Sequence, residues 1–159
     1  MGLKESLEER RQREEAKRYF RSNNPYFFSS EMWMKLIISG LGVSLGCGLL
    51  YGLFTMLVRI QFSYVLALIG VVIAKALRKI SGVGNEKLGI LTVVLYFFSI
   101  VFSFVISIAL YNLMAGGSVM VIFNPMVWLA GFTNLFTGSI ISSIFYLFGA
   151  IYAYNLASQ

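Results

Sequence analysis

The sequence carries no charged side chain between Leu88 and Gln159, and the last ones before that stretch are Glu86 and Lys87. A water-facing surface needs charged groups, so a stretch this long and rich in Ile, Leu, Val and Phe cannot be the surface of a soluble domain. Over the whole chain, charged residues make up 13% and hydrophobic residues 58%, whereas soluble domains average about 25% charged. The pattern indicates a helical protein whose solvent is lipid.

Histidine and aspartate are also absent, and Cys47 is the only cysteine. These absences exclude metal sites built on histidine or clustered cysteine, Ser-His-Asp and Cys-His catalytic arrangements, and an intramembrane pair of aspartates. All 7 acidic residues are glutamates outside the apolar runs, which argues against a proton relay in the bilayer. We therefore expect no enzyme activity and no cofactor. Cys47 lies in apolar, Gly-rich sequence and is expected to be a small packing residue.

Residues 1–24 differ from the rest of the chain because acidic and basic side chains alternate there. Glu9 and Arg13, for example, lie one helical turn apart in the favourable order. This pattern predicts a charged cytosolic helix that ends before Pro25, followed by a linker and interface anchor over residues 25–33. The helix is either a polar tail or a docking helix for a cytosolic partner or lipid headgroups.

Residues 34–159 predict an all-α integral membrane domain with four transmembrane helices. The spans are predicted over residues 34–58, 62–77, 88–113 and 132–156. The second is short for a hydrocarbon core of ~30 Å, which takes about 20 residues, and Lys75 near its end is expected to extend to the headgroups. Residues 118–131 are apolar but interrupted at Asn124-Pro125. They predict an interfacial or re-entrant segment, or else the broken first part of a long tilted fourth helix.

Basic residues gather in the connection between the second and third spans, at Lys75, Arg78, Lys79 and Lys87. The positive-inside rule places this connection in the cytoplasm and, with four spans, both termini as well. The many basic residues of the first 31 positions agree with that orientation. We expect a protein of a bacterial cytoplasmic membrane whose basic loop contacts anionic lipid headgroups. No nucleic-acid partner is expected.

Small residues recur four positions apart on the first and last predicted spans. The set is Gly42, Gly46, Gly48, Gly52, Gly149 and Ala153. This spacing leaves a groove in which another helix backbone can approach closely. It indicates either packing of the first and last spans within the chain, or a face for a second copy or a membrane-protein partner.

Two functions remain open at this stage. The first is a non-enzymatic scaffold or accessory subunit of a membrane complex, which packs through the Gly-rich first span. The alternative is an oligomeric pore or carrier for a small solute, although Ser103, Ser107 and Asn112 give the third span only a broken polar face. The Gly-rich basic loop 79–85 either makes a simple turn near headgroups or offers backbone amides to a phosphate.

The stretch IGVVIAKALRKISGVG at 69–84, followed by KLGIL at 87–91, resembles a pattern in uncharacterised bacterial multi-pass membrane proteins. In those proteins a short helix ends in a basic Ser-Gly turn and a new span begins. The sequence FGAIYAYNLA at 148–157 is similar to their C-terminal helix. Many of them carry an N-terminal zinc ribbon, but this chain has no cysteine pair, so zinc binding is not implied. The resemblance implies a multi-span fold and no particular activity.

Overall fold

A computed structural model of the chain describes residues 12, 28–58, 63–137 and 139–159. The charged helix expected over residues 1–24, apart from Gln12, and the first part of the expected linker lie outside these described residues. Within them every regular element is helical and none is a strand. The elements are α2 (Ser30–Val58), α3 (Ser63–Ser81), α4 (Glu86–Met114), the 3-10 helix η1 (Val119–Phe123), α5 (Pro125–Thr137) and α6 (Ile140–Ser158).

Three helices, α2, α4 and α6, are long and apolar enough to cross a membrane. At about 1.5 Å per residue, the 29-residue helices α2 and α4 are each roughly 43 Å long and the 19-residue α6 roughly 28 Å, against a hydrocarbon core of ~30 Å. These helices indicate an integral membrane protein. The predicted second span corresponds to α3, which has 19 residues but carries Lys75, Arg78 and Lys79 near its end.

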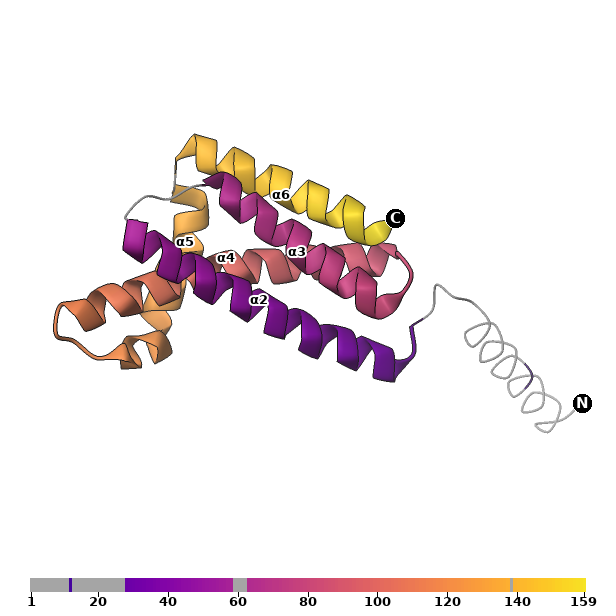
Figure 1. The fold of residues 1–159 in the computed structure, drawn as a ribbon, viewed down its shortest axis with the longest axis horizontal. Helices are drawn as coiled ribbons and strands as arrows, with labels where there is room; N and C mark the ends of the chain where they lie inside the picture. The colour runs from indigo at the N-terminus through magenta and orange to yellow at the C-terminus, as the bar shows by residue number, and fades with distance from the viewer. Residues whose placement is uncertain (1–11, 13–27, 59–62, 138) are drawn as a thin grey trace, which may run out of the picture.

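The bundle consists of two parallel helix pairs (Figure 1). Ser44 of α2 contacts Leu95 of α4, and Gly52 contacts Ser103. Because the residue numbers rise together, these two helices run in the same direction. Helices α3 and α6 are also parallel to each other. They are antiparallel to α2 and α4, because the connection between α3 and α4 is only residues 82–85. Helix α4 packs against every other described element. Its apolar window is 56% buried, against 28% for α2 and α6, so α4 is the central helix.

The structure divides the expected span 132–156 into two helices. The side chain of Asn124 accepts a hydrogen bond from the Met126 backbone N–H at 3.0 Å, and Pro125 takes the first helical position, where its missing N–H costs nothing. Asn124-Pro125 therefore begins α5 instead of interrupting a span. Helix α6 begins after Ser139, whose backbone is not helical (φ −56°, ψ 139°). The expected interfacial segment 118–131 corresponds to η1 and the first half of α5, which lies crosswise to the bundle (Figure 1).

Small residues let the backbone of α2 lie directly against α4. Ser44, Gly48 and Gly52 follow one another at four-residue spacing and therefore share one face of the helix. A methyl group on Gly48 would meet the Ser99 carbonyl oxygen at 2.8 Å, and one on Gly52 would meet the Ser103 carbonyl oxygen at 2.9 Å. Side chains larger than hydrogen therefore do not fit at these two positions.

Hydroxyl groups cross the same contact. Ser44 Oγ donates to the Leu95 carbonyl at 2.9 Å, and Ser99 Oγ donates back to the Ser44 carbonyl at 2.8 Å. Nearer the C-terminal ends of the two helices, the hydroxyls of Thr55 and Ser107 lie 2.9 Å apart. Hydrogen bonds of this kind between membrane helices contribute about 0.6 kcal/mol on average. Together they fix the register of α2 on α4.

We expect Gly48→Ala to lower the free energy of unfolding by about 1–3 kcal/mol, a typical cost of overpacking, because the added methyl group must displace α4 at Ser99. Gly46→Ala is the matched control on the same helix, since within the part of the chain that the structure describes nothing lies within 4 Å of the added methyl group. The control should be neutral, or stabilising by up to about 1 kcal/mol because alanine favours helix. Unfolding by steric trapping in bicelles measures both. Equal losses from the two substitutions would contradict this packing.

Candidate functional site

Four of the six small residues predicted as a packing face contact other helices of the chain. Gly48 and Gly52 face α4, as described above. Gly149 and Ala153 of α6 face α3, where a methyl group on Gly70 would meet the Ala153 Cβ and the Gly149 carbonyl oxygen at 3.1 Å each. Each ridge of small residues therefore has its own partner helix, so the ridges of the first and last spans do not serve to pack those spans on each other.

Gly42 and Gly46 point away from the other described helices. Both are exposed, and no atom of the described residues lies within 4 Å of an added methyl group at either position. Two residues along a helix turn by about 200°, so this pair lies nearly opposite the face that contacts α4. The exposed side chains of Ile38, Leu45 and Leu49 stand beside the two glycines. We call these five residues the outer α2 face.

The predicted basic residues gather at one end of the bundle. Lys75, Arg78, Lys79 and Lys87 are all exposed, on the last two turns of α3 and the first turn of α4. The start of α2 and the C-terminus of α6 lie at the same end (Figure 1). Arg78 also donates from Nη1 to the Leu156 carbonyl at 3.3 Å, so its charge lies near the C-terminal ends of both α3 and α6, where the helix dipoles favour a cation.

The Gly-rich loop after α3 is tied to the end of α6. Gly82 has a left-handed backbone (φ 72°) that ends α3. The Asn85 backbone N–H donates to the Ala157 carbonyl at 3.4 Å, and Gly84 lies so close to Gln159 that a methyl group would overlap it. The loop thus makes a packed turn, and its contacts hold three helix ends together.

The polar side chains considered for a pore lining are engaged within the chain. Ser103 donates to the Ile100 carbonyl of its own helix at 2.6 Å, and Ser107 bonds to α2 as described above. The Asn112 side chain donates to the Ser118 carbonyl at 2.9 Å and so holds the turn after α4. The polar face of the third span therefore serves helix packing and turn formation.

The ring of Tyr96 fills the notch left by the small residues of α6. This side chain of α4 is fully buried, and its hydroxyl oxygen contacts the place where a methyl group on Gly149 would lie. Among the described residues, the Tyr96 hydroxyl oxygen is the one buried side-chain polar atom without a hydrogen-bond partner. Tyr96 thus connects α4 to the α3–α6 pair by close packing and not by a hydrogen bond.

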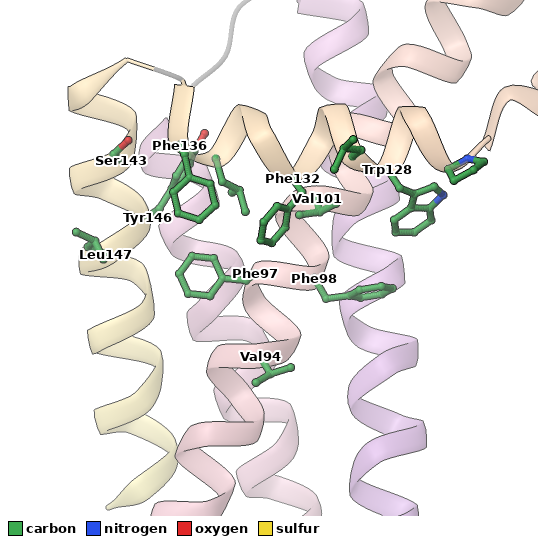
Figure 2. Close-up of a pocket in the computed structure, with 13 residues that line it drawn as sticks. Val94, Phe97, Phe98, Val101, Trp128, Phe132, Phe136, Ser143, Tyr146 and Leu147 are labelled. Atoms are coloured by element: carbon green, nitrogen blue, oxygen red, sulfur yellow. The ribbon is translucent and has the colours of Figure 1, made fainter. Parts of the chain in front are cut away.

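A cavity of about 900 Å³ lies between α4, α5 and α6. Figure 2 shows α5 crossing its top, with aromatic side chains of α5 directed toward those of α4. The lining side chains are Val94, Phe97, Phe98, Val101, Pro125, Trp128, Leu129, Phe132, Leu135, Phe136, Ser143, Tyr146 and Leu147. The cavity could not be found from the sequence, because it depends on the direction that α5 takes after Asn124. The sequence is compatible with two directions there, an interfacial segment or the start of a tilted span.

Helix α5 touches α4 closely at one side of the cavity. A methyl group on Gly131 would meet the Val101 carbonyl oxygen at 3.2 Å, so glycine permits the close crossing. One turn earlier, the Trp128 ring lies 6.0 Å from the rings of both Phe98 and Phe102, centroid to centroid. The Trp128 indole N–H donates to the Ile122 carbonyl at 2.7 Å. These contacts fix α5 across the bundle.

Comparisons of the chain with protein-family models, curated proteins and solved structures found no match. The resemblance to bacterial multi-pass membrane proteins therefore has no matching family behind it, and the function proposed below rests on the geometry of the described residues.

Proposed function

We propose that this chain is a non-enzymatic scaffold or accessory subunit of a membrane complex, which binds a helix of another membrane chain on its outer α2 face. The observation that carries the proposal is the contrast among the glycines of α2. Gly48 and Gly52 are small because α4 leaves no room for a side chain, whereas Gly42 and Gly46 face open space. Glycine costs a helix about 1 kcal/mol relative to alanine, and no described contact of this chain uses its small size at Gly42 or Gly46.

A helix of another chain would make use of the small size of Gly42 and Gly46. Pairs of small residues four positions apart allow two membrane helices to approach with their backbones in contact. With Ile38, Leu45 and Leu49 beside the glycines, the outer α2 face would hold such a helix on the side of α2 opposite α4. Helix α2 would then lie between its own central helix and the partner, with a ridge of small residues toward each.

The geometry supports the pore or carrier less well. A solute path needs polar groups that remain available to the solute. Here Ser44 and Ser99 exchange hydrogen bonds with backbone carbonyls across the contact between α2 and α4, and Ser107 bonds in the same interface. No observation among the described residues favours a path.

We further propose that α3 is the fourth membrane span. Its 19 residues extend roughly 28 Å, close to the thickness of the hydrocarbon core. Its inner side is buried against the three apolar helices at Leu66, Ile73 and Leu77. Its outer side exposes Leu68 and Val72, and large apolar side chains in such positions belong in lipid. The basic residues occupy only the last two turns, from which long side chains reach the headgroups.

With four spans, the basic end of the bundle faces the cytoplasm together with both chain termini. The support is the charge asymmetry: the four exposed basic residues lie at one end. Of the connections toward the other end, the one between α2 and α3 contains a single basic residue, Arg59, and residues 88–159 carry no charged side chain. Basic residues in short connections favour the cytoplasmic side. Anionic headgroups of that leaflet would then be the nearest lipid partners of Lys75 and Lys79.

If α3 crosses the membrane, a water-soluble reagent reaches its two ends from opposite sides. In a Cys47→Ala background, Tyr64→Cys and Lys79→Cys place a thiol at each end of α3. A membrane-impermeant maleimide added to intact cells should label Tyr64→Cys and leave Lys79→Cys unlabelled. Permeabilised cells provide the control, because Lys79→Cys must react there. Labelling of both ends from the same side would refute the crossing.

The scaffold proposal predicts that a neighbouring protein helix lies against the outer α2 face in native membranes. A photo-crosslinking residue at Leu49 should form a protein adduct, whose mass tells a second copy from a different chain. The same residue at Ile151, exposed on α6, is the positional control. Adding Gly42→Leu and Gly46→Leu should weaken the association at least about tenfold, or roughly 1.4 kcal/mol.

The matched control for these substitutions is Ala130→Leu, which enlarges an exposed small residue of α5 away from the outer α2 face and should leave the adduct at Leu49 unchanged. Lipid adducts alone at Leu49, or a protein adduct that persists in a folded Gly42→Leu/Gly46→Leu variant, would overturn the proposal.

A further inference from the structure

We propose that the cavity between α4, α5 and α6 binds one hydrocarbon chain of a membrane lipid. The lining is carbon except for a few polar atoms, and these already have partners. Ser143 Oγ donates to the Ser139 carbonyl at 3.5 Å, Trp128 donates to Ile122, and Tyr146 shares a hydrogen bond with the Ser142 side chain.

The chemistry of this lining decides which occupant fits. Water in a protein cavity needs two to four polar partners, and apolar cavities of this kind stay dry. A polar solute would likewise lose its own hydrogen bonds without gaining new ones. A hydrocarbon chain has no such requirement, and the cavity volume of about 900 Å³ lies within the roughly 300–1,000 Å³ usual for ligand sites.

The open side of the cavity faces the surroundings of the bundle. Val101, Leu135 and Tyr146 form the buried floor, at 8%, 7% and 5% exposure, while Val94 and Leu147 on the rim are 60% and 59% exposed. The rim belongs to α4 and α6, two helices that are long and apolar enough to cross the membrane. A lipid chain beside these helices can therefore enter sideways without passing through water.

The direction of the cavity also matches a lipid chain. Val94 lies seven residues before Val101, or about 10 Å along α4, so the cavity extends along the bundle axis, in which direction lipid chains run. Helix α5 lies across its upper end (Figure 2). A flexible chain fits beneath α5, whereas a straight partner helix running along the same axis would collide with it.

Bromine-labelled lipid tests the proposal through a tryptophan that lines the cavity. The chain has two tryptophans, so Trp33→Phe leaves Trp128 as the only one. This variant is placed in nanodiscs of phosphatidylcholine with increasing fractions of phosphatidylcholine brominated at mid-chain. A bound chain predicts two components of quenching: one that saturates at a low brominated fraction, and one that rises in proportion to the fraction because of the surrounding lipid.

Filling the cavity should remove only the saturable component. Val94→Phe with Leu147→Phe enlarges two rim residues, whereas Ile90→Phe with Ile151→Phe makes matched changes one turn away on the same helices, at exposed positions outside the cavity. The first pair should lose the saturable quenching, and the control pair should keep it.

Quenching of Trp128 that is strictly proportional to the brominated fraction in the Trp33→Phe protein already overturns the proposal, without the cavity-filling substitutions. So does saturable quenching that the filled and the control variants retain equally. Loss of all quenching together with a crosslinked dimer through α5 would assign the cavity to a second copy of the chain and would also overturn it. None of these outcomes depends on the outer α2 face, so they leave the scaffold proposal to its own test.

Discussion

Close contact between the backbones of α2 and α4 underlies the arrangement of the other helices. In lipid no hydrophobic force draws one apolar helix toward another, so helices stay together through tight packing and hydrogen bonds. Gly48 and Gly52 permit that approach, and the reciprocal bonds between Ser44 and α4 fix its register. Once this register is set, α4 occupies the centre, and the rotation of α2 decides that Gly42 and Gly46 face outward.

The crosswise path of α5 is the second feature with consequences for function. Asn124 and Pro125 begin a helix where a continuous span would otherwise run, and Gly131 lets that helix cross α4 closely. The crossing holds α5 away from part of α4 and α6, and the space that remains is the apolar cavity. The two proposed binding surfaces are therefore products of different elements, one of the rotation of α2 and the other of the direction of α5.

Much of the helical architecture could be predicted from the sequence because lipid imposes strict rules. The charge-free stretch after Lys87 and the long apolar runs require helices in a bilayer. The role of each glycine could not be predicted, because Gly46 and Gly48 both belong to GxxxG motifs and the pattern alone does not tell them apart. They lie two residues apart and therefore fall on different faces of the helix, one toward α4 and one away from it. Ser44 completes the ridge toward α4 but lies outside the GxxxG pattern. Asn124-Pro125 was ambiguous because the same pair can stop one helix or start another.

We propose that α2, α3, α4 and α6 stand together in lipid, with their outward apolar side chains toward the hydrocarbon and the basic end in water. Nitroxide labels at Leu50, Val72 and Lys79 in proteoliposomes test it most directly, because dissolved oxygen concentrates in the bilayer and a nickel chelate stays in water. We expect labels at Leu50 and Val72 to collide mainly with oxygen and the label at Lys79 to collide mainly with nickel. Nickel collisions that dominate at Val72 would contradict the proposal.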